Sequence, residues 1–304
     1  MNRYFKELGI LRQYGDMEYN EAMKLIEAGE ISKAIATLRN KPELMDDLSF
    51  INDTALHMLA KRISKSDRIH NDIDYDTICD AINLITEVLD VYPSIATLQN
   101  SKGNTILHYL ANCPNIFDDP ERSMISKLTT YSNLQKIIFN HLDSLHIKNK
   151  KEGHTPLHNA LMSRFSMLAD MIIDADPSTI YDQNKAGCDA FSLCIYTDNN
   201  EIGNKILGID TNVVNTKPFG KTNLLASAYG RLNGEMVDKI NEIAPMQKEE
   251  LLNNKSLDFS TTLEMYNYHL EKGNCYKIKN TSDNADLQFL QTIKELKEMN
   301  QIEK

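Results

Sequence analysis

A five-residue motif recurs along this chain, and its recurrence limits the folds that the chain can adopt. The motif is Asp-Thr-Ala-Leu-His at 53–57, Asn-Thr-Ile-Leu-His at 104–108 and His-Thr-Pro-Leu-His at 154–158. Two weaker copies start at Gly187 and Gly220, which places the threonine-equivalent positions at 54, 105, 155, 189 and 222. The last two spacings are 34 and 33 residues, and the first two are longer, at 51 and 50. Such a period indicates a stack of similar units, each of which contacts mainly its neighbours.

Each motif has the composition of a helix start. A threonine hydroxyl can cap the free amides of the first turn, and proline is tolerated there because its missing N–H would have no helical partner. Apolar residues follow at spacings of three and four, such as Ile82, Ile85 and Leu89 in the first unit, and they predict a second helix. We therefore expect a pair of helices in each unit.

The motif resembles the Gly-x-Thr-Pro-Leu-His turn of ankyrin repeats, where it opens the first of two antiparallel helices. Residues 154–158 contain the full Thr-Pro-Leu-His, and the first two copies keep threonine, leucine and histidine. The resemblance covers about residues 47–245. It implies an all-α fold, an ankyrin-repeat solenoid with helical caps and enlarged first two repeats. It also implies that the motif histidines hydrogen-bond a neighbouring loop.

The segments outside the repeats are expected to close the ends of the stack. Residues 1–46 are interpreted as an N-terminal helical cap, because a solenoid needs ends with one polar side. Residues 246–304 are interpreted as a C-terminal helical cap or extension, although a helix predicted over 286–299 could instead bind a partner or dimerise. The extra residues of the first two repeats fall near 61–77 and 112–130. They are expected to form loops or lengthened helix ends that stack into one projection.

Composition excludes several classes of function. The net charge of −10 and the pI near 5.3 argue against nucleic acid as a partner. No apolar run approaches the roughly 20 residues of a membrane span, and charged residues interrupt the apolar residues at the start, which argues against a classical secretory signal. The five scattered cysteines are typical of a reducing compartment. We therefore expect a cytoplasmic protein that is monomeric when it is not bound to a partner.

Ankyrin proteins generally recognise partners through the concave face, which is formed by loop tips and the exposed ends of the first helices. By position, the resemblance predicts a partner-binding surface at Lys61, Arg62, Lys102, Asn104, Lys151, Glu152, His154, Met162, Tyr196, Phe219, Lys221 and Tyr229. Aromatic residues are frequent anchors of interfaces, so the tyrosines of this set are the expected anchors. Two interpretations remain for the tip lysines, which are either a solvated face or a contact to an acidic patch on the partner.

A catalytic role has little support in the sequence. The chain has no P-loop, GxGxxG, GxSxG or HExxH motif, and the motif histidines recur about one repeat apart, too far to share a metal ion. We expect a non-enzymatic protein that binds a partner protein and needs no cofactor or metal. The alternative is an ankyrin array with a small cysteine-dependent hydrolase or transferase activity in its C-terminal region, where Cys275 and His269 are the candidate nucleophile and base.

The enlarged repeats, rich in asparagine, lysine and isoleucine, also resemble those of ankyrin proteins that intracellular bacteria deliver into host cells. This resemblance implies a secreted effector that acts in the host cytosol. Its partner would then be a host protein.

Overall fold

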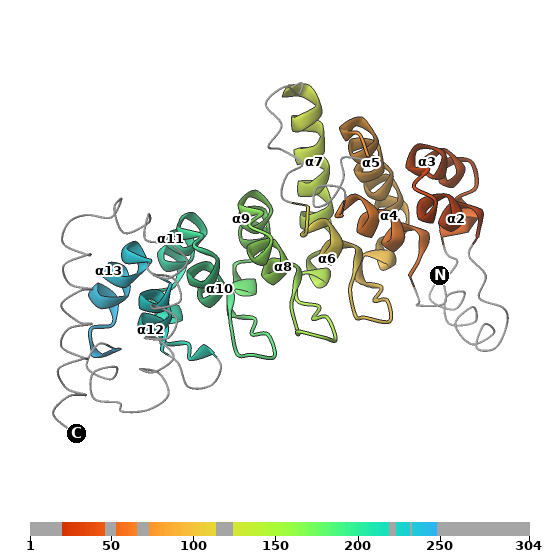
Figure 1. Cartoon of the computed structure of the whole chain (residues 1–304). Helices are drawn as coiled ribbons and strands as arrows, with labels where there is room; N and C mark the ends of the chain where they lie inside the picture. Colours follow the sequence, from red (N-terminus) through yellow and green to blue (C-terminus); the bar gives the residue numbers. More distant parts are fainter. Residues whose placement is uncertain are drawn as a thin grey trace. The chain divides into compact units, whose positions relative to one another are not determined.

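The structure is a computed structural model, and it describes residues 20–45, 53–65, 73–113, 124–218, 223–231 and 233–247. All regular elements in these ranges are α-helices or short 3-10 helices (Figure 1). None of the described helices combines the length and the apolar character needed to cross a membrane. The chain divides into two compact units, residues 1–110 with 119–137 and residues 111–118 with 138–304. Each unit is described by itself.

Unit 1 is a set of helices packed in pairs. In chain order its elements are α2 (Glu21–Glu27), α3 (Ile31–Asn40), η1 (Pro42–Met45), α4 (Ala55–Ile63), α5 (Tyr75–Val91), η2 (Pro93–Thr97), α6 (Ile106–Leu110) and most of α7 (Met124–Asn140). Helix α2 packs on α3, and α4 packs on α5. The first helices α2, α4 and α6 contact one another in succession, and α3 contacts α5. This order of contacts is that of stacked helix pairs.

Unit 2 repeats the same arrangement. Its elements are η4 (Leu142–Ser144), α8 (Pro156–Met162), α9 (Ser166–Ala175), η5 (Pro177–Tyr181), α10 (Ala190–Thr197), α11 (Asn200–Ile209), η6 (Thr211–Asn215), α12 (Leu224–Gly230) and α13 (Gly234–Ile243). The pairs are α8 with α9, α10 with α11, and α12 with α13. Helices α8, α10 and α12 contact one another in succession, as do α9 and α11.

The core of each unit lies between the helix pairs and is built from the residues that the repeat pattern places there. The motif leucines Leu56 and Leu157 are fully buried, and Leu107 is 2% exposed. The second helices bury the stripes expected for them, for example Leu168, Met171 and Ile172 on α9. Because each pair buries its apolar face against the next pair, an isolated pair would leave this surface in water.

The second helices of the two longer repeats are themselves longer. Helices α5 and α7 have 17 residues each, whereas α9, α11 and α13 have 10. Part of each predicted insertion therefore extends a helix, and residues 66–72 and 114–123 lie outside the described residues. Within unit 1, Cys79 Sγ on α5 lies 3.0 Å from Thr130 Oγ1 on α7, and Asn133 donates a hydrogen bond to Asn83. The extended helices thus contact each other along their sides.

Several sequence predictions concern residues outside the described part of the chain. These are the helix predicted over 286–299, the pair formed by Cys275 and His269, and the site residues Phe219 and Lys221. The described part of the N-terminal segment contains α2 and α3.

Candidate binding surface

The threonine and histidine of each of the first three motifs form one hydrogen-bonded turn. In the third copy, Thr155 caps α8 by accepting the backbone N–H of His158, and the Nδ1 atom of His158 accepts the backbone N–H of Thr155 at 3.2 Å. The Nε2 atom of His158 lies 3.1 Å from the carbonyl oxygen of Cys188, in the loop before the next repeat. The first copy is built alike, with His57 Nε2 3.0 Å from the carbonyl of Leu98.

These contacts require neutral imidazoles. One ring nitrogen accepts a hydrogen bond from a backbone amide and the other donates to a carbonyl, which only the neutral ring can do. Burial lowers the pKa of His57, and it lowers the pKa of His158 to about 4. The predicted role of the motif histidines, tying a helix start to a neighbouring loop, is confirmed for His57 and His158.

An asparagine shapes the loop tip that precedes the second, third and fourth motifs. The side-chain oxygen of Asn149 accepts hydrogen bonds from the backbone amides of Glu152, Gly153 and His154 at 3.0–3.2 Å. Asn100 accepts in the same way from residues 102 and 104, and Asn184 from residues 186 and 188. The sequence analysis missed these asparagines. Their signal is an asparagine three or four residues before a glycine.

Glycine is required at the third tip for two reasons. Gly153 has a positive φ of 73°, which glycine adopts without strain. A Cβ atom at this position would also lie 3.0 Å from the backbone nitrogen of Lys185, on the next tip. That nitrogen donates a hydrogen bond of 2.9 Å to the carbonyl of Glu152. The two neighbouring tips of unit 2 are therefore held together through their backbones.

The first and third repeats thus each have two helices and a capped Thr-x-x-His turn whose histidine contacts the loop before the next repeat. The helix pairs have the arrangement of ankyrin repeats. The all-α ankyrin fold expected from the motif is confirmed, with the first two repeats carrying the longer second helices.

Among the comparisons with known proteins, similarity is found with solved structures. No family model matches the sequence, and a search of curated proteins finds no match. Among solved structures, a chain in the complex of a predatory endopeptidase from Bdellovibrio bacteriovorus with an immunity protein has a TM-score of 0.52 at 14% identity. The match covers 74% of this chain and 99% of that chain.

Two further solved structures are ankyrin repeat proteins. The ankyrin repeat domain of Bcl-3, a member of the IkappaB family, has a TM-score of 0.45 at 14% identity, with 76% of this chain and 88% of that chain covered. An ankyrin repeat protein from Leishmania major has a TM-score of 0.41 at 14% identity, with 92% and 97% covered. At this identity the likeness concerns the fold alone.

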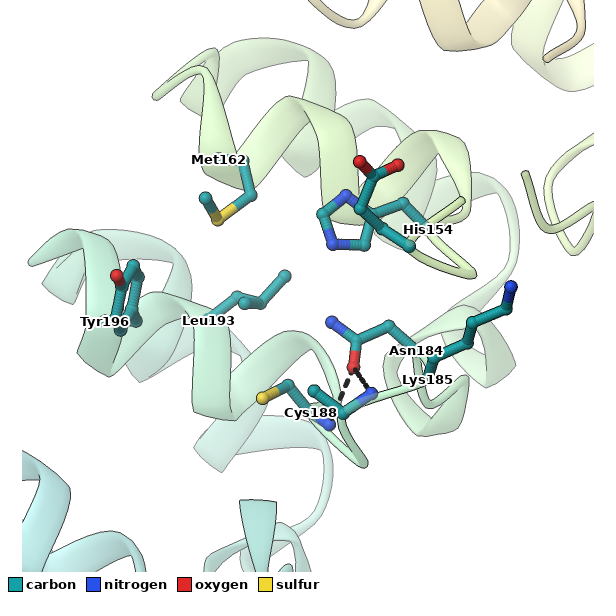
Figure 2. Close-up of a pocket in the computed structure, with 9 residues that line it drawn as sticks. His154, Met162, Asn184, Lys185, Cys188, Leu193 and Tyr196 are labelled. Carbon is teal, nitrogen blue, oxygen red and sulfur yellow. Dashed lines mark hydrogen bonds between the residues drawn. The ribbon is translucent and has the colours of Figure 1, made fainter. Parts of the chain in front are cut away.

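A hollow of about 430 Å³ lies between the tip that carries Glu152, the next tip, which carries Lys185, and the helices α8 and α10 of unit 2 (Figure 2). Four of the predicted site residues line it, namely Glu152, His154, Met162 and Tyr196. The other lining residues are Asn184, Lys185, Ala186, Cys188 and Leu193. The structure therefore brings together the part of the predicted surface that belongs to unit 2.

The floor of the hollow is apolar and its edge is exposed. Met162 ends α8 and is 41% exposed, and Tyr196 on α10 is 46% exposed. The buried Leu193, one turn before Tyr196 on α10, lies beside them and points toward the tip residues (Figure 2). The ring of His154 stacks on that of His158, with centroids 5.5 Å apart. Burial lowers the pKa of His154, so this ring is neutral at physiological pH.

Charged groups surround the apolar floor. Lys185 and Glu152 line the hollow, and Glu152 forms an ion pair of 2.9 Å with the exposed Lys151. Beyond the hollow, the guanidinium carbon of Arg231 lies 3.7 Å from the centroid of the Tyr196 ring. A cation at this distance from an aromatic face is attracted to it. The sequence analysis missed Arg231, which follows a degenerate repeat motif.

The predicted site residues of unit 1 are not among the residues that line this hollow. Lys61, on α4, pairs with the buried Asp53 at 3.4 Å, and Arg62 follows it. Lys102 and Asn104 form a tip of unit 1. Tyr229 belongs to α12, but its side chain lies outside the described residues. The predicted surface is thus divided between the two units.

The described residues offer no arrangement for metal chemistry, because no group of three His, Cys, Asp or Glu side chains among them could hold an ion. The cysteines near the hollow are buried. Burial raises the pKa of the Cys194 thiol far above its ordinary value, so this cysteine is not a nucleophile at neutral pH.

Proposed function

We propose that this chain is a protein-binding module that holds a partner protein at the hollow of unit 2. One observation carries the proposal: Met162 and Tyr196, both exposed and largely apolar, converge on an apolar floor beside two ordered loop tips. Tyrosine and methionine are enriched in protein interfaces, and aromatic anchors contribute much of their binding energy. The hollow is large enough to receive side chains of a partner.

The rigidity of the tips supports this proposal. Binding costs free energy whenever loops must become ordered. Here Asn149 and Asn184 already hold the tip backbones, and the hydrogen bond between Lys185 and Glu152 joins one tip to the next. A partner would therefore meet a surface that is already formed. The similar solved complex from Bdellovibrio bacteriovorus is itself a complex of two proteins, which agrees with such a role.

Delivery into a host cell, a host protein as partner and a cysteine-dependent activity stay predictions from the sequence. Delivery into a host cell and action on a host protein rest on the style of the repeats alone. The alternative cysteine-dependent activity rests on Cys275 and His269, which lie outside the described residues. The proposal made here concerns binding at the hollow and does not depend on either.

Photo-crosslinking tests the proposal directly. A benzophenone amino acid replaces Met162 in one variant and Glu201, an exposed residue of α11, in another. Both variants are incubated with a eukaryotic lysate and irradiated. We expect specific protein crosslinks from position 162 and none of the same proteins from position 201.

A second pair of variants provides the matched control. Tyr196→Ala should abolish capture of the crosslinked protein, because it removes the aromatic anchor at the hollow. Tyr181→Ala removes a tyrosine that is equally exposed but lies on η5, and it should leave capture unchanged. Equal capture by wild type and by Tyr196→Ala would rule the hollow out as the binding site.

A further inference from the structure

Arg231 carries a positive charge that the described residues do not neutralise. No described carboxylate forms an ion pair with its guanidinium. Its Nε atom is buried and, within the described part of the chain, donates to no acceptor. Leaving a buried donor without an acceptor costs free energy. The contact with Tyr196 holds this group in place beside the hollow.

The neighbouring tip adds positive charge of its own. Lys185 lines the hollow, and its Nζ donates to the uncharged backbone carbonyl of Lys150. Glu152 is the one carboxylate among the described lining residues, and Lys151 is paired with it. The whole chain carries a net charge of −10, so this local excess of cations is opposite to the average surface. A partner surface with charge complementary to the hollow would therefore be negative.

We infer that the hollow takes an acidic linear segment of the partner, with an apolar side chain between Met162 and Leu193 and a carboxylate on Arg231. This inference rests on the proposed binding site and specifies what that site recognises. A guanidinium presents parallel N–H groups that match the two oxygens of a carboxylate. Glu152 at the same hollow disfavours a doubly charged phosphate, so an Asp- or Glu-bearing segment fits better than a phosphopeptide.

Selection of random dodecapeptides displayed on phage tests this inference on the full chain. We expect the enriched peptides to share an acidic residue close to a large apolar residue. An enriched peptide is then synthesised with a fluorescent label, and its Kd is measured by fluorescence polarisation. Arg231→Gln should raise this Kd about 10-fold or more, the usual effect of losing a charge-assisted hydrogen bond. Arg231→Lys, which keeps the charge but not the paired donors, should give a smaller increase.

Lys24→Gln is the matched control. Lys24 is an exposed residue of α2 outside the hollow, and its loss changes the net charge of the chain by the same amount. The Kd should stay at the wild-type value. An equal effect of Lys24→Gln and Arg231→Gln would overturn the inference, because it would reduce the contact to general electrostatics. A thermal melt checks that Arg231→Gln is folded. If it is not, the Kd of Arg231→Lys is compared with that of Lys24→Gln instead.

The other outcomes separate the inference from the proposed function. Absence of any enriched peptide, enrichment of neutral or basic peptides, or tighter binding of a phosphoserine version would overturn the acidic specificity. If such peptides still lose affinity with Tyr196→Ala, the hollow remains the binding site and only the inference fails. If neither Tyr196→Ala nor Arg231→Gln changes the affinity, the binding site itself is wrong.

Discussion

At the scale of single residues, asparagine and histidine side chains hold the loops that carry the candidate surface. The side-chain oxygen of Asn149 accepts hydrogen bonds from three backbone amides of one tip. His158 joins a helix start to the following loop. Both side chains are at least nine-tenths buried. They act as structural connections between repeats, although their residue types are those often associated with catalysis or glycosylation.

Asn149→Ala should lower the free energy of unfolding by about 1–3 kcal/mol, because it leaves buried backbone amides without an acceptor. Asn149→Asp keeps the accepting oxygen and should cost much less. Urea unfolding of both variants measures the difference. Equal losses in the two variants would show that the amide nitrogen, and not the accepting oxygen, matters at this position.

The sequence predicted part of the site at this scale and missed another part. Motif register alone placed Glu152, His154, Met162 and Tyr196, since equivalent positions of repeats face the same surface. Leu193 was missed although it lies one helical turn before Tyr196. Arg231 could not be found in this way, because its contact with Tyr196 joins two repeats and depends on how they pack.

At the scale of elements, the starts of the first helices follow from the motif, and the lengths of the second helices do not. The start of α8 directly after Thr155 agrees with the capping expected there. The polar sequence of the two insertions was compatible with loops and with lengthened helices, so it did not decide between them. The longer α5 and α7 are supported by contacts with each other, such as Cys79 with Thr130. Contacts between residues 51 positions apart are not visible in local sequence patterns.

Leu157→Ala should lower the free energy of unfolding by about 2–5 kcal/mol, the usual cost of a cavity at a fully buried leucine. Leu128→Ala is the control, since Leu128 on α7 is 59% exposed and its truncation leaves no comparable cavity. Thermal or urea unfolding compares the two variants. A Leu157→Ala protein as stable as wild type would contradict the packing of α8 described here.

At the scale of the whole molecule, repeated buried histidines make stability depend on pH. The pKa of His57 and His158 is lower in the folded than in the unfolded chain, so the unfolded chain binds more protons as the pH falls below about 6.5. The stabilisation is complete above that pH and is lost on acidification towards pH 4. Buried Asp189, whose pKa is raised by burial, and His146, whose pKa is raised by Asp176 and Asp182 against the effect of burial, act in the opposite direction.

The contribution of one histidine can be isolated with His158→Gln. A pKa lowered from 6.5 to about 4 corresponds to about 3 kcal/mol in the free energy of unfolding, lost between about pH 6.5 and pH 4. The difference in stability between wild type and His158→Gln should therefore shrink from about pH 7 to about pH 4.5. Urea unfolding at both pH values measures it. A difference that is constant with pH would mean that His158 is not neutral in the folded chain.

At the joined tips of unit 2, some of the residues that shape the backbone are different from the residues that line the hollow. Asn149 and Gly153 set the course of the backbone and do not line the hollow, whereas the side chains of Glu152, Lys185 and Tyr196 do. Residues of the second kind can be exchanged without rebuilding the scaffold. Such a chain can change its partner by few substitutions over evolutionary time, and the same freedom makes these positions the natural ones to randomise when designing new binders.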